Sequence, residues 1–339
     1  MKKSFLSLSL AVLLGVLASC STKVDLYADY KDIPVIYGLI DATADTNVIK
    51  IVRAFSGSDE ASIDATQVAL IPDSCNYPGK LDARIVEYKN VYGNNYQPTG
   101  RELVLDTMTI HNKQEGAFYY PNQKVYFTTG RFNENTSAVR YKYKLHVLKG
   151  NDTISAETGI VGGEDFSIIT SMVIFSAEPS DKTSRVTFKP ADNAVVYDVK
   201  MQFNYQENRN GQIANKDVHW SFGTKSIEDL NYEDGSYYLN YGENMLFNYL
   251  NGAIGADTVN VERYIGDFVI SISAGGDELY NYIQINSPSA GFSQTVPDYT
   301  NINGGFGVFS SRITLNKIVR LSARTQVDLY NKPWRFIQQ

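Results

Sequence analysis

Residues 195–205 read Val-Val-Tyr-Asp-Val-Lys-Met-Gln-Phe-Asn-Tyr, and this stretch decides the fold. Apolar or aromatic side chains occupy every second position from Val195 to Tyr205, whereas most positions between them are polar. Successive side chains of a β-strand point to opposite faces, so this period of two predicts a long strand. One face of that strand belongs in a core, and the other lies largely in water.

The chain on either side of this stretch repeats the pattern in shorter segments. Residues 140–148 alternate in the same way, and a turn at 149–152 leads into a returning segment at 153–160. Short alternating segments separated by Gly, Asn and Asp turns are typical of β-sandwiches. The 24 Tyr and 16 Phe fit this class, because aromatic side chains favour strands. We therefore predict an all-β fold with two tandem immunoglobulin/fibronectin-like β-sandwich domains.

Helical spacing occurs in two places in the second half of the chain. Apolar side chains recur at i, i+3, i+4 and i+7 over residues 243–251, and Gly252 follows where a C-terminal cap would lie. A second such pattern surrounds residues 279–283. The second domain is therefore expected to contain one or two short helices.

The length of 339 residues exceeds one typical domain, so two domains are expected. Gly162-Gly163 is a candidate linker, after which the strand pattern restarts. The predicted divisions are a signal peptide at 1–19, a lipidated tether at 20–32, an N-terminal β-sandwich at 33–163, a C-terminal β-sandwich at 164–325 and a C-terminal tail at 326–339.

The first twenty residues resemble a bacterial lipoprotein signal. Two lysines precede a short apolar run, and Leu17-Ala18-Ser19 leads into Cys20 like a lipobox. In signals of this kind the Cys thiol receives the lipid and the chain is cut just before it. We expect Cys20 to anchor the protein in the outer membrane, on its periplasmic or its cell-surface face.

The sequence argues against most kinds of catalytic chemistry. The three histidines are not at metal-ligand spacing, and no Gly-x-Ser-x-Gly elbow is present. The formal net charge of −6 disfavours nucleic acid as a partner. We therefore predict a protein that is not an enzyme and that has no metal site and no cofactor.

Two kinds of surface site are candidates. Aromatic faces stack on apolar faces of sugars, and the densest cluster for a glycan contact is Trp220, Tyr237, Tyr238 and Tyr241. Three Asp-Thr-apolar triplets resemble the acceptor motif of Bacteroides O-glycosylation, which makes Thr107, Thr153 and Thr258 candidate acceptors.

Several motifs together resemble a family of Bacteroidetes cell-envelope lipoproteins that is catalogued as a domain of unknown function. The motifs are the lipobox, residues 33–40, Arg53-Ala54-Phe55 and residues 297–309. The resemblance implies an all-β, immunoglobulin-like build and an outer-membrane location, with no catalytic residues. Separately, residues 185–205 are similar to a fibronectin type III B–C hairpin, with Phe188 where that module usually has Trp.

The leading hypothesis is a non-catalytic outer-membrane lipoprotein with a binding or assembly role, whose partner is another envelope protein or a glycan. The main alternative is a fimbrial subunit or adhesin that assembles by strand exchange after protease cleavage at Arg53. In that case, the end of the chain at 334–337 would either dock in its own subunit or act on the next one. A glycan-binding lipoprotein is the lesser alternative.

Overall fold

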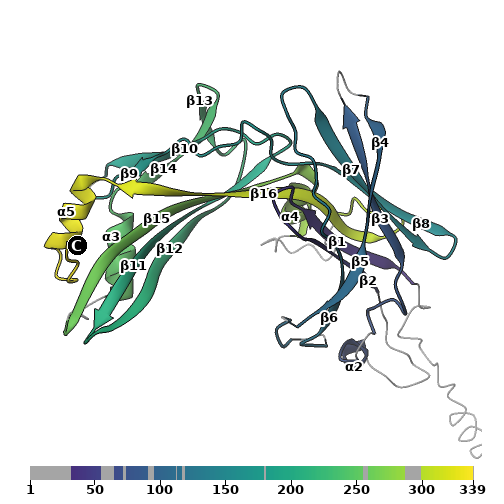
Figure 1. Cartoon of the computed structure of the whole chain (residues 1–339), viewed down its shortest axis with the longest axis horizontal. Helices are drawn as coiled ribbons and strands as arrows, with labels where there is room; N and C mark the ends of the chain where they lie inside the picture. The colour runs from purple at the N-terminus through teal and green to yellow at the C-terminus, as the bar shows by residue number, and fades with distance from the viewer. Residues whose placement is uncertain are drawn as a thin grey trace, which may run out of the picture.

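The computed structural model describes residues 32–54, 65–71, 74–90, 95–111, 113–116, 119–178, 181–254, 259–286 and 299–338. These residues form an elongated molecule with two lobes, each made mostly of β-strands (Figure 1). Within each lobe two sheets pack face to face around a hydrophobic core. The predicted all-β, sandwich-type fold with a few short helices is confirmed.

The C-terminal lobe is built around residues 195–205. That stretch lies in β11 (Val196–Arg209), which pairs with β12 (Gln212–Ser226) on one side and with β15 (Val261–Gly275) on the other. The facing sheet contains β10 (Thr183–Phe188), β13 (Asn231–Glu233) and β14 (Ser236–Gly242). Tyr197, Met201 and Phe203 point into the core between these sheets. Because β10 and β11 lie in different sheets, the predicted hairpin at 185–205 is wrong.

The N-terminal lobe places one sheet of β16, β1, β2, β6 and β5 against another of β4, β3, β7 and β8. Its strands are β1 (Pro34–Ile40), β2 (Asn47–Arg53), β3 (Asp82–Asn90), β4 (Gln97–Val104), β5 (Asp106–Ile110), β6 (Gln123–Thr128), β7 (Arg140–Lys149) and β8 (Asp152–Gly159). The chain changes sheets at Leu105, which is fully buried, because β4 pairs with β3 whereas β5 pairs with β6.

One strand runs through both lobes. β16 (Phe306–Leu321) pairs with β1 in parallel through its first six residues and with β15 in antiparallel through residues 312–319. Its last residues pair with β9 (Met172–Val173). Ile302 and Phe309 therefore belong to the N-terminal core, whereas Ile313 and Val319 belong to the C-terminal core. The two cores divide near residue 160, and the predicted linker there is a buried bridge in which Gly162 and Asp192 exchange backbone hydrogen bonds.

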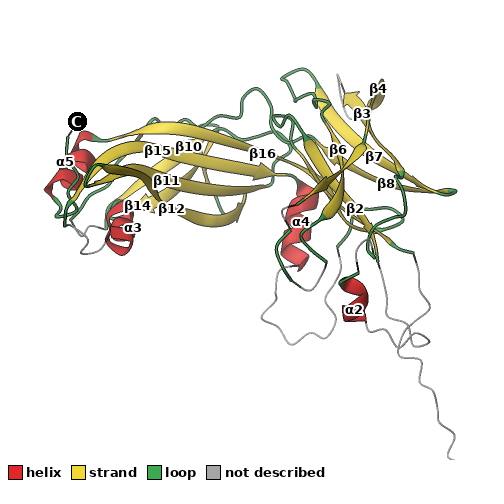
Figure 2. Cartoon of the chain, turned by 60° about the horizontal axis from the view of Figure 1, so that its bottom comes forward, coloured by secondary structure: helices red, strands yellow, loops and turns green. Residues whose placement is uncertain are grey.

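Within the described residues, four helices lie outside the sheets, and they can be followed in Figure 2. They are α2 (Ala65–Ala69), α3 (Met245–Ile254), α4 (Asp277–Asn286) and α5 (Ala323–Asn331). The two expected helices are present as α3 and α4, but Gly252 lies inside α3 rather than capping it. α5 and the residues after it replace the predicted C-terminal tail, since Trp334 and Phe336 are buried in the C-terminal core.

The lobes meet at a buried polar cluster around Glu278 in the first turn of α4. Its carboxylate accepts hydrogen bonds from Thr158 of β8 and Ser310 of β16, both at 2.9 Å. The neighbouring Ser311 hydroxyl accepts one from the backbone N–H of Val161, at 2.9 Å. Burial raises the pKa of Glu278 above its usual value, although the bonds to the two hydroxyls act in the opposite direction. These bonds fix α4 and β8 against the shared strand.

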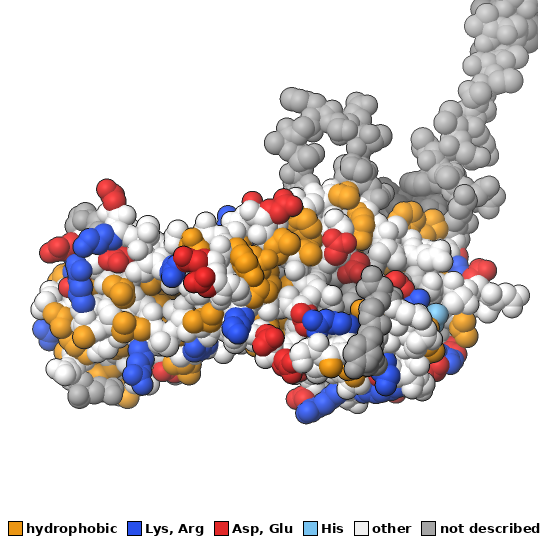
Figure 3. Space-filling view, turned by 90° about the horizontal axis from the view of Figure 1, so that it is seen from above, with side chains coloured by type: hydrophobic (Ala, Val, Ile, Leu, Met, Phe, Trp, Pro, Cys, Tyr) orange, Lys and Arg blue, Asp and Glu red, His pale blue; other side chains and the backbone are white. Residues whose placement is uncertain are grey.

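Charged side chains on the outside are mixed in sign. On the face shown in Figure 3, Lys and Arg side chains are interspersed with Asp and Glu, without one extended basic area. None of the described helices has the length and apolarity needed to cross a bilayer.

Candidate functional site

The outer face of the sheet around β1 and β2 is apolar. The side chains that point away from the core are Val35, Tyr37, Leu39, Val48, Lys50 and Val52, and only one of them is charged. A sheet with one face in water normally carries polar side chains on that face. This face is partly exposed, with Tyr37 at 41% and Val48 at 37%. It therefore offers apolar surface that the described chain covers only in part.

Two walls turn this face into a groove, which we call the outer groove. On one side stand Leu279, Tyr282 and Ile283 of α4, and on the other stand Ala69 of α2 together with Cys75 and Tyr119. Figure 2 shows α2 and α4 on the same side of the lobe. The outer groove contains two concavities, of about 490 and 600 Å³, that share Tyr37. Each lies in the size range of small-molecule sites.

Tyr37 is held at the middle of the outer groove by α4. Its hydroxyl is hydrogen-bonded to Tyr282, and the two rings meet edge to face with their centroids 6.1 Å apart. Burial, followed by the interaction with Tyr282, raises the pKa of Tyr37 to about 12. The phenol is therefore neutral at physiological pH and presents an apolar ring with a hydrogen-bonding tip.

Four cations gather at the end of the outer groove nearest to the start of β1: Lys50, Arg53, Lys113 and Lys124. Among the described residues that line this end there is no carboxylate. Lys124 donates to the backbone carbonyl oxygens of Tyr77 and Gly79. Burial, and next the charge of Lys113, lower the pKa of Lys50 below its ordinary value. The arrangement concentrates positive charge beside an apolar surface.

Arg53 is positioned by the backbone on both sides of it. Its N–H donates to the carbonyl of Cys75 at 2.8 Å, and the next residue, Ala54, donates to Ile33 at 2.8 Å. Its side-chain Nε is buried and has no hydrogen-bond partner among the described residues. The predicted protease site thus lies at the paired end of β2, opposite Pro34, and not in an exposed loop.

The chain's end also fails to supply a free strand for a neighbouring subunit. Arg263, only 1% exposed, pairs with Glu207 at 2.7 Å and donates to the carbonyl of Trp334 at 2.7 Å. The backbone of Arg263 bonds to Arg335 and Ile337 on either side of Phe336. Of the two outcomes that the sequence left open for 334–337, the structure shows docking within the same chain.

The aromatic glycan candidates do not form a surface platform. Trp220 and Tyr241 are 4% and 3% exposed, because both point into the C-terminal core. Trp220 stacks on Tyr249 with ring centroids 4.9 Å apart. Tyr237 and Tyr238 are half-buried on β14, where Arg185 lies 5.0 Å from the ring centre of Tyr238. The buried pair cannot stack on a sugar in this fold, so this four-residue site is a wrong prediction.

The modification candidates are in different settings. Thr153 is exposed at the start of β8, whereas Thr107 is half-buried in the edge strand β5. Thr258 and the lipidation site Cys20 lie outside the described residues.

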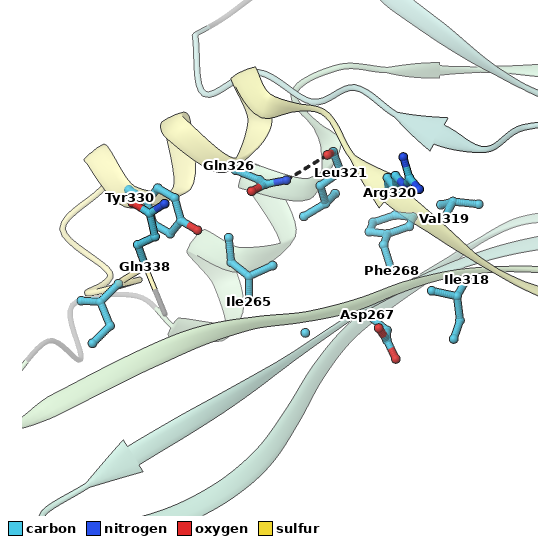
Figure 4. A pocket seen from close by; sticks show the side chains of 12 residues that line it. Ile265, Asp267, Phe268, Ile318, Val319, Arg320, Leu321, Gln326, Tyr330 and Gln338 are labelled. Atoms are coloured by element: carbon cyan, nitrogen blue, oxygen red, sulfur yellow. Dashed lines mark hydrogen bonds between the residues drawn. The ribbon is translucent and has the colours of Figure 1, made fainter.

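A further concavity, separate from the outer groove, lies in the C-terminal lobe, where β16 diverges from β15 (Figure 4). Its volume is about 630 Å³, and α5 closes one side, with Gln326 bonded to the carbonyl of Leu321 at 3.1 Å. Its only charged lining residues in the described chain are Asp267 and Arg320, which are both exposed. This concavity therefore carries one charge of each sign, whereas the charged residues at the end of the outer groove are all cations.

The polar residues that usually signal catalysis are dispersed or satisfied. His219 bonds to Asp217 at 2.8 Å in the C-terminal lobe, whereas His111 bonds to Asn122 at 2.5 Å in the N-terminal lobe. Glu87, 3% exposed, accepts from Arg101, Tyr143, Thr99 and Asn133. No group of three or more His, Cys, Asp and Glu with metal-site geometry occurs within the described segments.

No protein-family model matches this chain, and no curated protein is significantly similar to it.

Sequence reasoning missed the outer groove although a signal was present. Residues 33–40 are apolar almost without interruption, and 48–52 contain a single charge. A strand with two apolar faces is expected to be covered on both. The cations could not be placed from the sequence, because Lys124 reaches this face through the pairing of β6 with β2 and Lys113 follows β5, which pairs with β6.

Proposed function

We propose that this protein is a lipid-anchored, non-catalytic binding protein of the cell envelope, and that the outer groove is its ligand site. The single observation that carries the proposal is the apolar, partly exposed outer face of β1 and β2. A face of this kind in a soluble lobe marks a binding surface more often than a chance exposure.

The position of the outer groove fits an anchored protein. Val35 lines it, and the described chain begins three residues earlier, at Asp32. If Cys20 carries the lipid, the twelve residues from 21 to 32 span at most about 40 Å. The outer groove would then face the membrane at short range, where ligands from the bilayer or the envelope are concentrated.

The fimbrial alternative gains no support from the described residues, because Arg53 is paired in a strand and the chain's end docks in its own lobe. Mass spectrometry of protein from native membranes tests the anchor directly. A lipidated N-terminus at Cys20 is expected, whereas a chain that begins at Ala54 would contradict it and support strand exchange.

The ligand site is tested with the anionic, apolar dye 1,8-anilinonaphthalenesulfonate. We expect saturable fluorescence enhancement that Val52→Asp abolishes, because a carboxylate would stand in the apolar floor. The matched control is Ile213→Asp, since Ile213 is 66% exposed at the far end of the β11–β12 hairpin and lines neither the outer groove nor the concavity of Figure 4. Equal dye binding by the wild type and both variants would refute the site.

A further inference from the structure

Two cations at this end of the outer groove have no anionic partner among the described residues. Lys50 and Arg53 form no ion pair in the described chain, and Nε of Arg53 is buried without a partner. Buried charges are normally paired, because an isolated one loses its hydration without compensation. A ligand with an anionic group would supply the missing partner.

The rest of the outer groove has an apolar floor that can contact an aliphatic chain, and Asp41, Asn47 and Arg312 also line that end. From Lys50 the floor runs past Tyr37 to Leu39 and Val48, where Leu279 and Ile283 of α4 form the wall. A sugar or a peptide backbone needs several hydrogen-bonding groups in fixed positions. Along this floor the Tyr37 hydroxyl is already bonded to Tyr282.

The two features lie in one line and are joined at Tyr37. Charge at one end and apolar surface along the other match a molecule with one anionic head and one chain. We propose that the outer groove binds a long-chain fatty acid, with its carboxylate at Lys50 and its chain directed past Tyr37 toward α4. This inference rests on the outer groove being the ligand site, as proposed above.

The chain's own lipid is a poorer occupant. The diacylglyceryl group expected on Cys20 is joined through ester and thioether bonds and has no anionic head. It would leave Lys50 uncompensated, whereas a carboxylate can accept a charge-assisted hydrogen bond from it.

The test is calorimetric titration with dodecanoate, and with dodecyltrimethylammonium as a ligand of equal chain length and opposite charge. The protein is the full mature chain with Cys20→Ser, which removes the need for detergent. We expect dodecanoate to bind saturably at one molecule per chain and the cation to bind at least about tenfold more weakly.

Two variants at one position separate binding from folding. Lys50→Glu should weaken dodecanoate by about 10–100-fold, the worth of a hydrogen bond to a charged group plus repulsion. Lys50→Met should weaken it by about tenfold or more while its unfolding midpoint is no lower than that of the wild type. Lys216→Glu, at an exposed position of β12, is the matched control and should bind like the wild type.

Equal affinity for the two head groups, or an equal loss in the Lys216→Glu control, would overturn the fatty-acid assignment. So would dye binding that Val52→Asp abolishes together with no dodecanoate binding, although the outer groove would then remain a ligand site for another chemistry. Lys50-dependent binding to phosphatidylglycerol vesicles without binding of monomeric dodecanoate would make the face a membrane contact and overturn the assignment too. Failure of both the dye and dodecanoate would refute the proposed function itself.

Discussion

The outward faces of β1 and β11 belong to the same continuous sheet and differ in composition. β11 turns Asp198, Lys200, Gln202 and Asn204 outward, whereas β1 turns Val35, Tyr37 and Leu39 outward. The inward faces of both strands are buried and apolar. Burial of one face is enough to fold each lobe, so the second apolar face of β1 indicates a requirement other than folding. The difference separates a part of the sheet that supports the fold from the part at which we propose that a ligand binds.

The largest effect is expected inside the C-terminal lobe. Phe203 is fully buried, so Phe203→Ala should lower the free energy of unfolding by about 3–5 kcal/mol. Lys200 lies three residues earlier on the outward face of β11, and Lys200→Ala should change this free energy by less than about 0.5 kcal/mol. Denaturant unfolding measures both, and a large effect of Lys200→Ala would mean that the outer face of β11 is also covered.

An intermediate effect is expected on the outer face of β1. Leu39 is half-buried against the end of the outer groove near α4, so Leu39→Ala should cost about 1 kcal/mol. The matched outward change on β11, Gln202→Ala, should cost less than about 0.5 kcal/mol. If urea unfolding gives the same small value for both, the two outward faces are equivalent and the contrast fails.

A smaller, pH-dependent effect on stability is expected at Glu278, where the two lobes meet. The folded state raises the pKa of Glu278, so the folded protein holds its proton more tightly than the unfolded chain. The contribution of this group to stability is fully present below the unfolded pKa and is lost as the pH rises through the folded pKa.

Thermal unfolding between pH 4 and pH 7.5 should therefore show a gain at the acidic end that Glu278→Gln lacks. The nearby Asp277 is unchanged in this variant and serves as the internal reference. Identical pH profiles for the two proteins would show that Glu278 does not titrate differently in the fold.

The smallest effect is a gain of stability in the outer groove. Burial and Lys113 lower the pKa of Lys50, so its charge destabilises the free protein at neutral pH. Lys50→Met should raise the unfolding midpoint by about 1–2 °C, as binding residues often reduce stability. Lys216→Met is the exposed control, and a lower midpoint for Lys50→Met alone would show that the lysine is structural.

The strands were largely predictable because their signal is local. The alternation at 195–205 predicts β11, and that at 140–148 predicts β7. Local signals cannot show that residues 306–315 and 318–321 form one strand, because Asn316 and Lys317 interrupt the apolar pattern. They also cannot show which strands become neighbours, so the parallel pairing of β16 with β1 was beyond reach.

The same limit applies to the sites. Trp220 and Tyr241 look like surface aromatics in the sequence, but their neighbours in space decide their burial. Likewise, Arg53 was a candidate because of the peptide bond that follows it, but the sequence could not show that this residue is paired with Pro34 at the end of β2.

The parallel pairing of β16 with β1 also sets the order in which the protein matures. The N-terminal lobe contains the residues made first, yet one edge of β1 has no pairing strand until residues 306–311 are made. At ordinary rates of synthesis, about 10–50 s pass between the two strands. During that time the unpaired edge of β1 can pair with strands of other chains. The lobe that is synthesised first is therefore the lobe that most needs protection from aggregation before it reaches the native state.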